Sequence, residues 1–257
     1  MSISNLAYIH PKAQIGENVT IEPFAVVYED TQIGDNTWIA PHAVIMQGAR
    51  IGRDCKIHSG AVISNIPQDL KFKGEETVAI IGDRTIIREC ATINRGTADK
   101  QKTEVGEDCL LMAYVHVAHD CYLENNCILS NGVQLAGHVE IGHHAILGGT
   151  SAVHQFVKIG AHAMIGGGSL VTKDVPPYII AARYPVDFEG VNLLGLRRRG
   201  FSNPKIIQIQ EIYRLIYQSS LNTTQALEEI ENSIEPSAER DSILAFIKNA
   251  TRGIVKG

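Results

Sequence analysis

Apolar residues recur at every sixth position along most of this chain. Counting in steps of six from Ile9 to Val171 gives 28 positions, and 25 of them hold Ile, Val or Leu. The position four residues after nearly every one of these aliphatic residues is small or β-branched, as at Ala25, Cys55 and Ala61. That position lies two before the next aliphatic residue, and residues two apart in a strand share a face. The pattern therefore predicts short strands whose small and aliphatic residues point inward together.

The residues between these strands are suited to corners. The third and fourth residues of each six-residue unit, counted from the aliphatic one, are rich in Gly, Asn, Asp and His, which tolerate the dihedral angles of tight turns. A short strand and a corner, repeated, describe a solenoid with three flat sides. Three units then form one coil of 18 residues, and each coil rises by about 4.8 Å, the spacing between strands.

Three positions break the six-residue pattern, namely Asp69, Glu75 and Asp99. They predict two loops expelled from the coil, over residues 64–78 and 98–104. Long loops inside so regular a frame are usually functional. Both loops are therefore candidates for contacts with a substrate.

The repeat stops near Pro176-Pro177, because proline has no N–H to donate to a ladder. Apolar residues return with helical spacing after Asn203-Pro204, a pair that is typical of a helix start. We therefore expect a parallel β-helix over residues 1–180, a linker over 181–195 and a small helical domain over 196–257.

Composition narrows the function classes. Apolar residues make up 44% of the chain and aromatic residues only 6%, so the core must be aliphatic. The net charge of −5 and the pI of about 6.1 argue against a nucleic-acid-binding protein. No apolar stretch is long enough to cross a bilayer, and the first residues do not resemble a signal peptide. We expect a cytoplasmic protein with no transmembrane segment.

The five cysteines do not indicate a disulfide framework, because their number is odd in a chain of this size. Four of them fall at the small inward position of the repeat, which predicts buried packing. These four are Cys55, Cys109, Cys121 and Cys127. Cys90 falls at a corner, and the repeat gives no reason for it.

Polar residues that are rare in such a frame gather at one corner, in the stretch "HVAHDC". His116 precedes the inward Val117 and so points outward, whereas His119 and Asp120 form the corner itself. Adding 18 residues gives the same corner in the next coils. The repeat therefore predicts two adjacent columns, and His154 stands just before the last corner. The columns are His119, Gly137 and Gln155, and Asp120, His138 and Phe156.

Such a corner is suited to acyl transfer. A histidine takes a proton from an attacking hydroxyl, and a glycine N–H one coil away donates to a developing oxyanion. Each histidine taken singly is equally well explained as a solvated turn residue. His116, His119, Asp120, His138 and His154 together favour a site.

Two readings from other classes remain open on these grounds. A metal site needs three convergent imidazoles. His138 and His143 are five residues apart, but a third ligand two coils earlier would fall at Lys102. A non-catalytic scaffold is the other alternative, although a scaffold needs neither the two expelled loops nor the polar corner.

Several motifs resemble one family closely. They are "RECATINRGT", "VHVAHDC", "LAGHVEIG", "AVHQFVKIGAHAMIGGGS", "DVPPY", "GVN" and "GLRRRGFS". Together they are similar to the UDP-N-acetylglucosamine acyltransferases, within the hexapeptide-repeat transferases, over nearly the whole chain. This resemblance implies a left-handed parallel β-helix followed by a small C-terminal helical domain. From the general rule for crossovers alone, a right-handed coil would be expected.

The resemblance also implies a reaction. The enzyme would transfer an (R)-3-hydroxyacyl chain from acyl carrier protein to the 3-OH of UDP-GlcNAc, the first step of lipid A biosynthesis. No cofactor or metal is implied, and the family is trimeric with sites between subunits. His119 matches the general base, Asp120 its support, and the Gly137 N–H the oxyanion donor. The residues that match substrate contacts are Asp69, Lys71, His116, His138, His154, Gln155, Asn192, Arg198 and Arg199.

Three further positions bear on specificity. Gly167 matches the position that limits acyl length, and glycine there predicts a long chain of fourteen carbons or more. Leu194 stands where relatives often have an acidic residue near the nucleotide, and Pro185 replaces a polar residue that some relatives have in the linker.

Alternatives within the same chemistry also stay open. The acceptor sugar could carry a 3-amino group, which would give an amide. The related N-acyltransferase of the pathway has an extra N-terminal domain, whereas this chain enters the repeat by Ile9. Acetyl-CoA transferases share the coil but seldom this tail.

Overall fold

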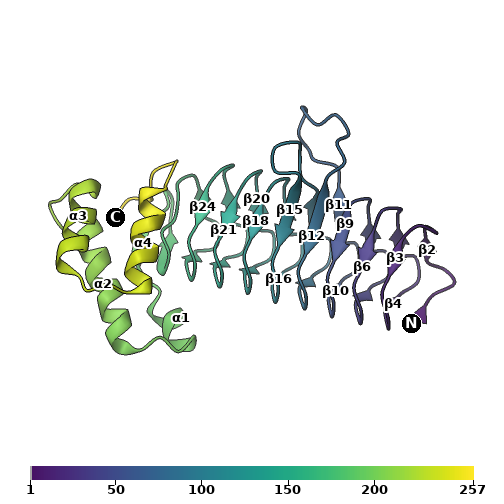
Figure 1. Cartoon of the computed structure of the whole chain (residues 1–257), viewed down its shortest axis with the longest axis horizontal. Coiled ribbons are helices and arrows are strands. Elements are labelled where there is room, and N and C mark those ends of the chain that lie inside the picture. The colour runs from purple at the N-terminus through teal and green to yellow at the C-terminus, as the bar shows by residue number, and fades with distance from the viewer. Residues whose placement is uncertain (1) are drawn as a thin grey trace.

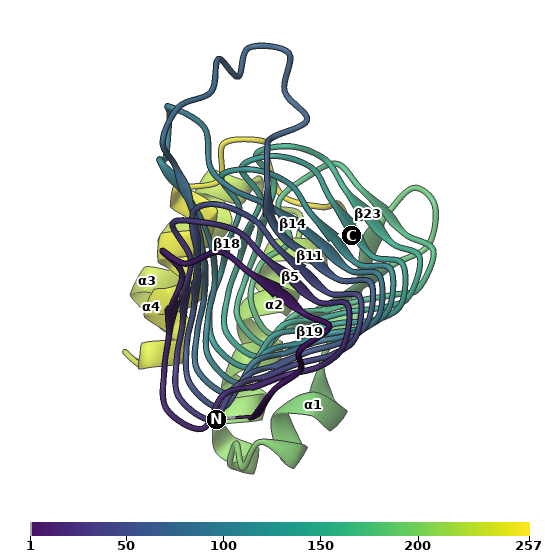
Figure 2. The same cartoon turned by 90° about the vertical axis from the view of Figure 1, so that its right-hand side faces the viewer.

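In a computed structural model, which describes residues 2–257, the chain forms an elongated solenoid with helices at its C-terminal end (Figure 1). Viewed along its axis, the coil has a triangular outline (Figure 2). From β1 to β26, successive strands go to three different sheets in turn, so a strand pairs with the third one after it. This is the three-sided parallel coil that the repeat predicted, in the left-handed form that the resemblance implied.

The three flat sides are named faces A, B and C. Face A contains β1 (Ser2–Ile3), β4 (Thr20–Ile21), β7 (Trp38–Ile39), β10 (Lys56–Ile57), β13 (Ile86–Ile87), β16 (Leu110–Leu111), β19 (Ile128–Leu129), β22 (Ile146–Leu147), β25 (Met164–Ile165), β27 (Ile179–Ala182) and β28 (Asp187–Val191). Face B contains β2 (Tyr8–Ile9), β5 (Val26–Val27), β8 (Val44–Ile45), β11 (Val62–Asn65), β14 (Thr92–Asn94), β17 (His116–Val117), β20 (Gln134–Leu135), β23 (Ala152–Val153) and β26 (Leu170–Val171). Face C contains β3 (Gln14–Ile15), β6 (Gln32–Ile33), β9 (Ala49–Ile51), β12 (Val78–Ile81), β15 (Lys102–Val105), β18 (Tyr122–Leu123), β21 (Glu140–Ile141) and β24 (Lys158–Ile159).

The core is a column of inward aliphatic and small side chains. The aliphatic residues from Ile21 onward are almost fully buried, and so are the four inward cysteines. Cys90 is exposed at a corner. The three faces differ on the outside. Faces A and B present mainly apolar side chains such as Ile128, Val44 and Leu170, whereas face C presents charged ones such as Glu140 and Lys158.

Corner residues adopt a left-handed backbone conformation. In most six-residue units the fourth residue has a φ near +60°, although few of these residues are glycine. The series includes Asn18, Asn36, Asp54, Tyr114, Asp120, His138 and Phe156. Side chains in this conformation cost roughly 1 kcal/mol or more each, so the ladders and the core must offset this strain at every corner.

Two loops leave the coil, and both are visible at the top of Figure 2. The first joins β11 to β12 and runs over 66–77, and the second joins β14 to β15 and runs over 95–101. The expected spans were 64–78 and 98–104. The second loop lies earlier because Lys102–Val105 pairs in parallel with Val78–Ile81. Paired residues are 30 apart across the first loop and 24 apart across the second, so the loops add two units and one unit, and the six-residue phase is kept.

The C-terminal part begins with a hairpin where a linker was expected. β27 pairs with β28 in antiparallel fashion, and four helices follow: α1 (Leu193–Arg198), α2 (Asn203–Tyr217), α3 (Thr223–Ser233) and α4 (Ala238–Lys248). Asn222 and Ser237 cap α3 and α4. The buried Tyr213 donates its hydroxyl to the carbonyl oxygen of Pro177 (2.5 Å) and so joins α2 to the last coil. In residues 2–257, no helix is both long and apolar enough to cross a membrane.

Replacing Gly48 by alanine should destabilise the fold, because Gly48 combines a φ of +81° with a position where a Cβ would overlap the backbone oxygen of Thr77. Gly74 has a φ of +93° but open space around its Cβ position, so Gly74→Ala isolates the dihedral cost. We expect a loss of about 2–4 kcal/mol for Gly48→Ala and about 1 kcal/mol for Gly74→Ala, measured by denaturant unfolding. Equal losses in the two variants would contradict this explanation.

Candidate active site

The polar corner lies between faces B and C, where β17, β20 and β23 turn into β18, β21 and β24. The expected columns form there, because the His138 N–H donates to the His119 carbonyl (3.1 Å) and the Phe156 N–H to the Gly137 carbonyl (3.1 Å). These bonds stack one coil on the next. They bring residues that are 18 apart in sequence within one strand spacing of each other.

His119 and Asp120 form a pair. The Nδ1 atom of His119 lies 2.8 Å from Oδ2 of Asp120. A carboxylate only accepts, so Nδ1 carries the proton and Nε2 keeps a free lone pair. Nε2 lies against Gly137, where a Cβ would come within 2.8 Å of it. Glycine is therefore required at 137 for this approach, and its N–H forms no hydrogen bond within residues 2–257.

The Asp120 carboxylate is fully buried and is held by a neighbour from the second loop. Thr97 donates its N–H to Oδ1 (2.9 Å) and its hydroxyl to Oδ2 (2.6 Å). The Asp120 N–H donates to the hydroxyl of Thr103 (2.8 Å). Burial alone would raise the pKa of Asp120, but the hydrogen bonds from His119 and Thr97 outweigh it and lower the pKa to about 2.

Neither threonine was singled out from the sequence. Thr103 occupies the small inward position of its unit, where a hydroxyl needs a partner, and this signal was available. Thr97 lies in the second loop, and the repeat carries no information on where such a loop folds back.

Two further histidines flank the pair. His138 lies edge-on to His119, with ring centroids 5.2 Å apart, and stacks on Phe156 at 4.5 Å. Its Nε2 lies 3.6 Å from Asp120 and its Nδ1 3.4 Å from Asp99 of the second loop. The Nδ1 atom of His116 is 2.7 Å from the Thr92 hydroxyl. Burial, and next the nearby His119, lower the pKa of His116, which favours its neutral form.

The metal alternative can be examined on this geometry. Ligating atoms of His119, Asp120 and His138 lie within 4.8 Å of one another. The His143 that was weighed as a ligand lies at the corner between faces C and A, in contact with His144 and His162. Oδ2 of Asp120 already accepts from His119 and from Thr97, so the hydrogen-bonded pair explains why these groups cluster.

Comparisons with known proteins decide the family. The C-terminal residues 174–255 match the family model described as UDP-N-acetylglucosamine O-acyltransferase, domain 2, and residues 30–65 and 102–137 match the bacterial transferase hexapeptide model. The chain is 54% identical over 253 residues to the acyl-[acyl-carrier-protein]–UDP-N-acetylglucosamine O-acyltransferase of Chlorobaculum parvum, covering 98% of this chain and 96% of the relative. The chain belongs to the UDP-N-acetylglucosamine O-acyltransferase family.

Solved structures agree over the full length. The acyltransferase from Bacteroides fragilis superposes with a TM-score of 0.97 at 52% identity and covers 98% of this chain and 99% of its own. The enzyme from Francisella novicida gives a TM-score of 0.96 at 38% identity, with coverages of 99% and 94%. The protein is thus an acyltransferase, and its polar corner is the candidate active site.

Other residues expected to contact substrate lie outside the His119–Asp120 pair within one chain of this acyltransferase. Asp69 and Lys71 lie in the first loop, where the Asp69 carboxylate accepts from the Lys71 N–H (2.9 Å). His154 and Gln155 are exposed one coil beyond His138, and Gly167 is exposed on the following coil.

Asn192, Arg198 and Arg199 lie at α1. Asn192 is buried, accepts from the Gly195 N–H (3.1 Å) as the helix cap and donates to the His162 carbonyl (3.0 Å). Arg199 donates to the His144 carbonyl (2.8 Å), whereas Arg198 is exposed. Burial, then the neighbouring His143, His144 and Arg199, lower the pKa of His162 to about 3, so this buried ring is neutral.

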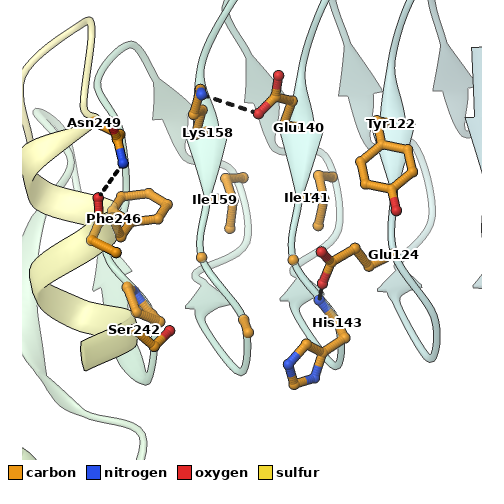
Figure 3. A pocket seen from close by; sticks show the side chains of 15 residues that line it. Tyr122, Glu124, Glu140, Ile141, His143, Lys158, Ile159, Ser242, Phe246 and Asn249 are labelled. Atoms are coloured by element: carbon orange, nitrogen blue, oxygen red, sulfur yellow. Dashed lines mark hydrogen bonds and ion pairs between the residues drawn. The ribbon is translucent and has the colours of Figure 1, made fainter. Parts of the chain in front are cut away.

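A groove of about 420 Å³ runs between face C and α4 (Figure 3). Glu140 and Lys158 pair across its floor at 3.2 Å, and Tyr122, His143 and Phe246 line it. This groove does not include His119 or Gly137, so it is separate from the corner.

Asp120→Asn should weaken the dependence of stability on pH in acid. The folded pKa of Asp120 (about 2) lies below the ordinary value of 3.8, so ionised Asp120 contributes stability that is present above pH 4 and lost as pH falls toward 2. Asparagine does not titrate. The difference in unfolding free energy between pH 5 and pH 2 should therefore shrink by about 2 kcal/mol, measured by denaturant unfolding.

The matched control is Asp54→Asn, because Asp54 occupies the same left-handed corner position (φ +56°) but is exposed. We expect it to keep the pH dependence of the native protein. A change as large in Asp54→Asn as in Asp120→Asn would contradict the role of the buried carboxylate.

Proposed function

We propose that this acyltransferase uses His119 as its general base and the Gly137 N–H as its oxyanion donor. As a member of its family, it transfers an acyl group from acyl carrier protein to UDP-GlcNAc, the first step of lipid A biosynthesis. The observation that carries the mechanism is the His119–Asp120 pair, which leaves Nε2 free beside Gly137. We further propose that the acyl group is an (R)-3-hydroxyacyl chain and that the acceptor is the sugar 3-OH.

The proposed chemistry needs one proton carrier. Nε2 of His119 takes the proton of the acceptor hydroxyl as its oxygen attacks the thioester carbonyl. The carbonyl oxygen becomes an oxyanion, which accepts a hydrogen bond from Gly137. When this intermediate collapses, the carbon–sulfur bond breaks and His119 returns its proton to the leaving thiolate. Asp120 stabilises the imidazolium formed in between and keeps Nδ1 protonated.

The remaining residues are proposed to orient the substrates. His116 lies on β17 just before the corner, His138 lies one coil beyond His119, and His154 and Gln155 extend the same edge toward the C-terminal end. Arg198 and Arg199 supply guanidinium groups, which suit a diphosphate. Arg199 keeps further N–H groups beyond the one that its His144 contact uses.

We propose that the working unit is a homotrimer with each site completed by a neighbouring copy. In one chain, the polar corner lies at the edge of the coil between faces B and C. The α1 end of the same chain lies at a different edge, beside faces C and A. The outer surfaces of faces A and B are apolar, and face C is charged. When face A of one copy packs against face B of a second copy, apolar surface is buried. The α1 end of the first copy then lies next to the polar corner of the second.

His119→Ala should abolish most of the activity, because it removes the base while leaving the coil intact. We expect the rate of acyl transfer from (R)-3-hydroxyacyl carrier protein to UDP-GlcNAc to fall by about two to four orders of magnitude, measured by product formation. His10→Ala, in the first coil, is the control and should keep the native rate. A His119→Ala variant that retains more than about a tenth of the rate would exclude His119 as the base.

Chain-length preference should depend on Gly167, which is exposed and whose Cβ position is crowded only by the Gly149 backbone, at 3.3 Å. We expect the native enzyme to prefer donors of fourteen carbons or more, and Gly167→Met to shift the preference to shorter chains. Competition among carrier proteins loaded with graded acyl chains measures this. Fastest turnover of short donors by the native enzyme would contradict the prediction.

A further inference from the structure

We propose that Thr97 is a positioning residue for the reaction, and that its hydroxyl and N–H fix the Asp120 carboxylate in the orientation that His119 requires. This inference rests on the proposed role of the His119–Asp120 pair. Thr97 does not touch the reacting atoms in this proposal, because it acts only through Asp120.

The contacts of the carboxylate carry the argument. Thr97 engages both oxygens of Asp120, its N–H on Oδ1 (2.9 Å) and its hydroxyl on Oδ2 (2.6 Å). Oδ2 is also the atom that accepts from His119 Nδ1 (2.8 Å). Two donors from one residue prevent rotation of the carboxylate, so the position of Oδ2, and with it the imidazole, is set by Thr97.

Comparison with other corners shows that this arrangement is not a general property of the coil. Asp54 and Asp108 occupy the same left-handed corner position as Asp120, and both are exposed. The Asp108 carboxylate pairs with a surface arginine, Arg84. Asp120 alone among these three is buried, because the second loop folds over its corner and delivers Thr97.

The second loop is itself tied to the first. The hydroxyl of Thr77 donates to the Gly96 carbonyl (2.6 Å), the Arg95 N–H to the Asn65 carbonyl (2.9 Å), and the Asn94 side chain to the Ile66 carbonyl (3.0 Å). The first loop carries Asp69 and Lys71. The first loop, expected to contact substrate, and the pair proposed to deprotonate the acceptor are therefore held in one hydrogen-bonded frame that passes through the second loop and Thr97.

The test compares the native enzyme with Thr97→Val, which removes the hydroxyl but keeps the N–H and the shape, and with Thr97→Ser, which restores a hydroxyl. We expect Thr97→Val to lower kcat by about tenfold while KM for both substrates stays within about twofold. Thr97→Ser should recover to within about threefold of the native kcat. Thr97→Ala, judged against Thr97→Ser, replaces the valine variant if that variant does not fold.

The control is Thr85→Val. Thr85 is buried, and its hydroxyl donates to the Gly106 carbonyl (2.7 Å) on a different coil edge, so the same chemical change is made away from the site. We expect its kcat to stay within about twofold of the native value.

A second readout does not depend on activity. The titratable and charged groups around Asp120 are His119 and His138, and on the face C side Lys100, Lys102, Glu104 and Glu140, which line a cavity of about 270 Å³ with it. Thr97→Val leaves all of these in place. Because the hydroxyl favours ionised Asp120, its loss should reduce the stability gained between pH 2 and pH 5, whereas Thr85→Val should not.

The outcomes separate the inference from the proposed function. If the native enzyme forms no product, the proposed function fails and this inference fails with it. If the native enzyme is active and Thr97→Val matches its kcat, only the inference fails. Failure of Thr97→Ser to recover, or an equal loss in Thr85→Val, would also overturn it, because either result would indicate a packing role.

Discussion

Parallel hydrogen bonding between successive coils is the constraint on which the rest of this structure depends. Away from the two loops, a residue in a flat side pairs with the residue 18 positions later, as His116 pairs with Gln134 and Gln134 with Ala152. Because the ladder runs along the whole solenoid, every inward position must be aliphatic or small and every corner must turn by the same angle. The ladder also removes the need for a disulfide, and the cysteines serve as small core residues.

The candidate site follows from that constraint. A base on one coil and an oxyanion donor on the next are separated by a strand spacing of about 4.8 Å, which the backbone fixes. His119 and Gly137 are related in this way. The coil leaves the orientation of the imidazole undetermined. The hydrogen bond that His119 donates to Asp120, and the one that Thr97 of the second loop donates to the same carboxylate, fix it. The rigid coil thus sets the distance between the base and the oxyanion donor, and the second loop sets the orientation of the imidazole.

The sequence predicted the features that the six-residue repeat determines, and few of the features that lie outside the repeat. The faces, the inward cysteines and the stacking of His119 on Gly137 follow from a period of six, since one coil is three units. The loops do not obey the period. The location of the second loop at 95–101, its return over Asp120 and the role of Thr97 depended on tertiary contacts that no local pattern records. The hairpin at 179–191 was also missed, because its residues do not follow the six-residue period.

Residues at α1 show the same limit. Family resemblance placed Asn192 among substrate contacts, and the structure shows its side chain capping α1 and bonded to His162. A motif shows which residues occur together in a family. The structure of one chain shows which hydrogen bonds each of those residues makes within that chain. A contact between Asn192 and substrate therefore stays a prediction. The hydrogen bonds that its side chain makes in one chain neither require nor exclude it.

At the left-handed corners, the side chains that provide chemistry also reduce the stability of the backbone. Asp120, His138 and Phe156 each occupy a backbone conformation that glycine adopts at lower cost. At the inward positions there is no such conflict, because the aliphatic or small residue that packs best in the core is also the one that stabilises the coil. A lineage selected only for thermal resistance would tend to lose side chains at these corners, whereas the inward positions would stay unchanged. A corner that holds side chains such as Asp120 and His138 on consecutive coils thus carries a backbone cost that glycine would reduce.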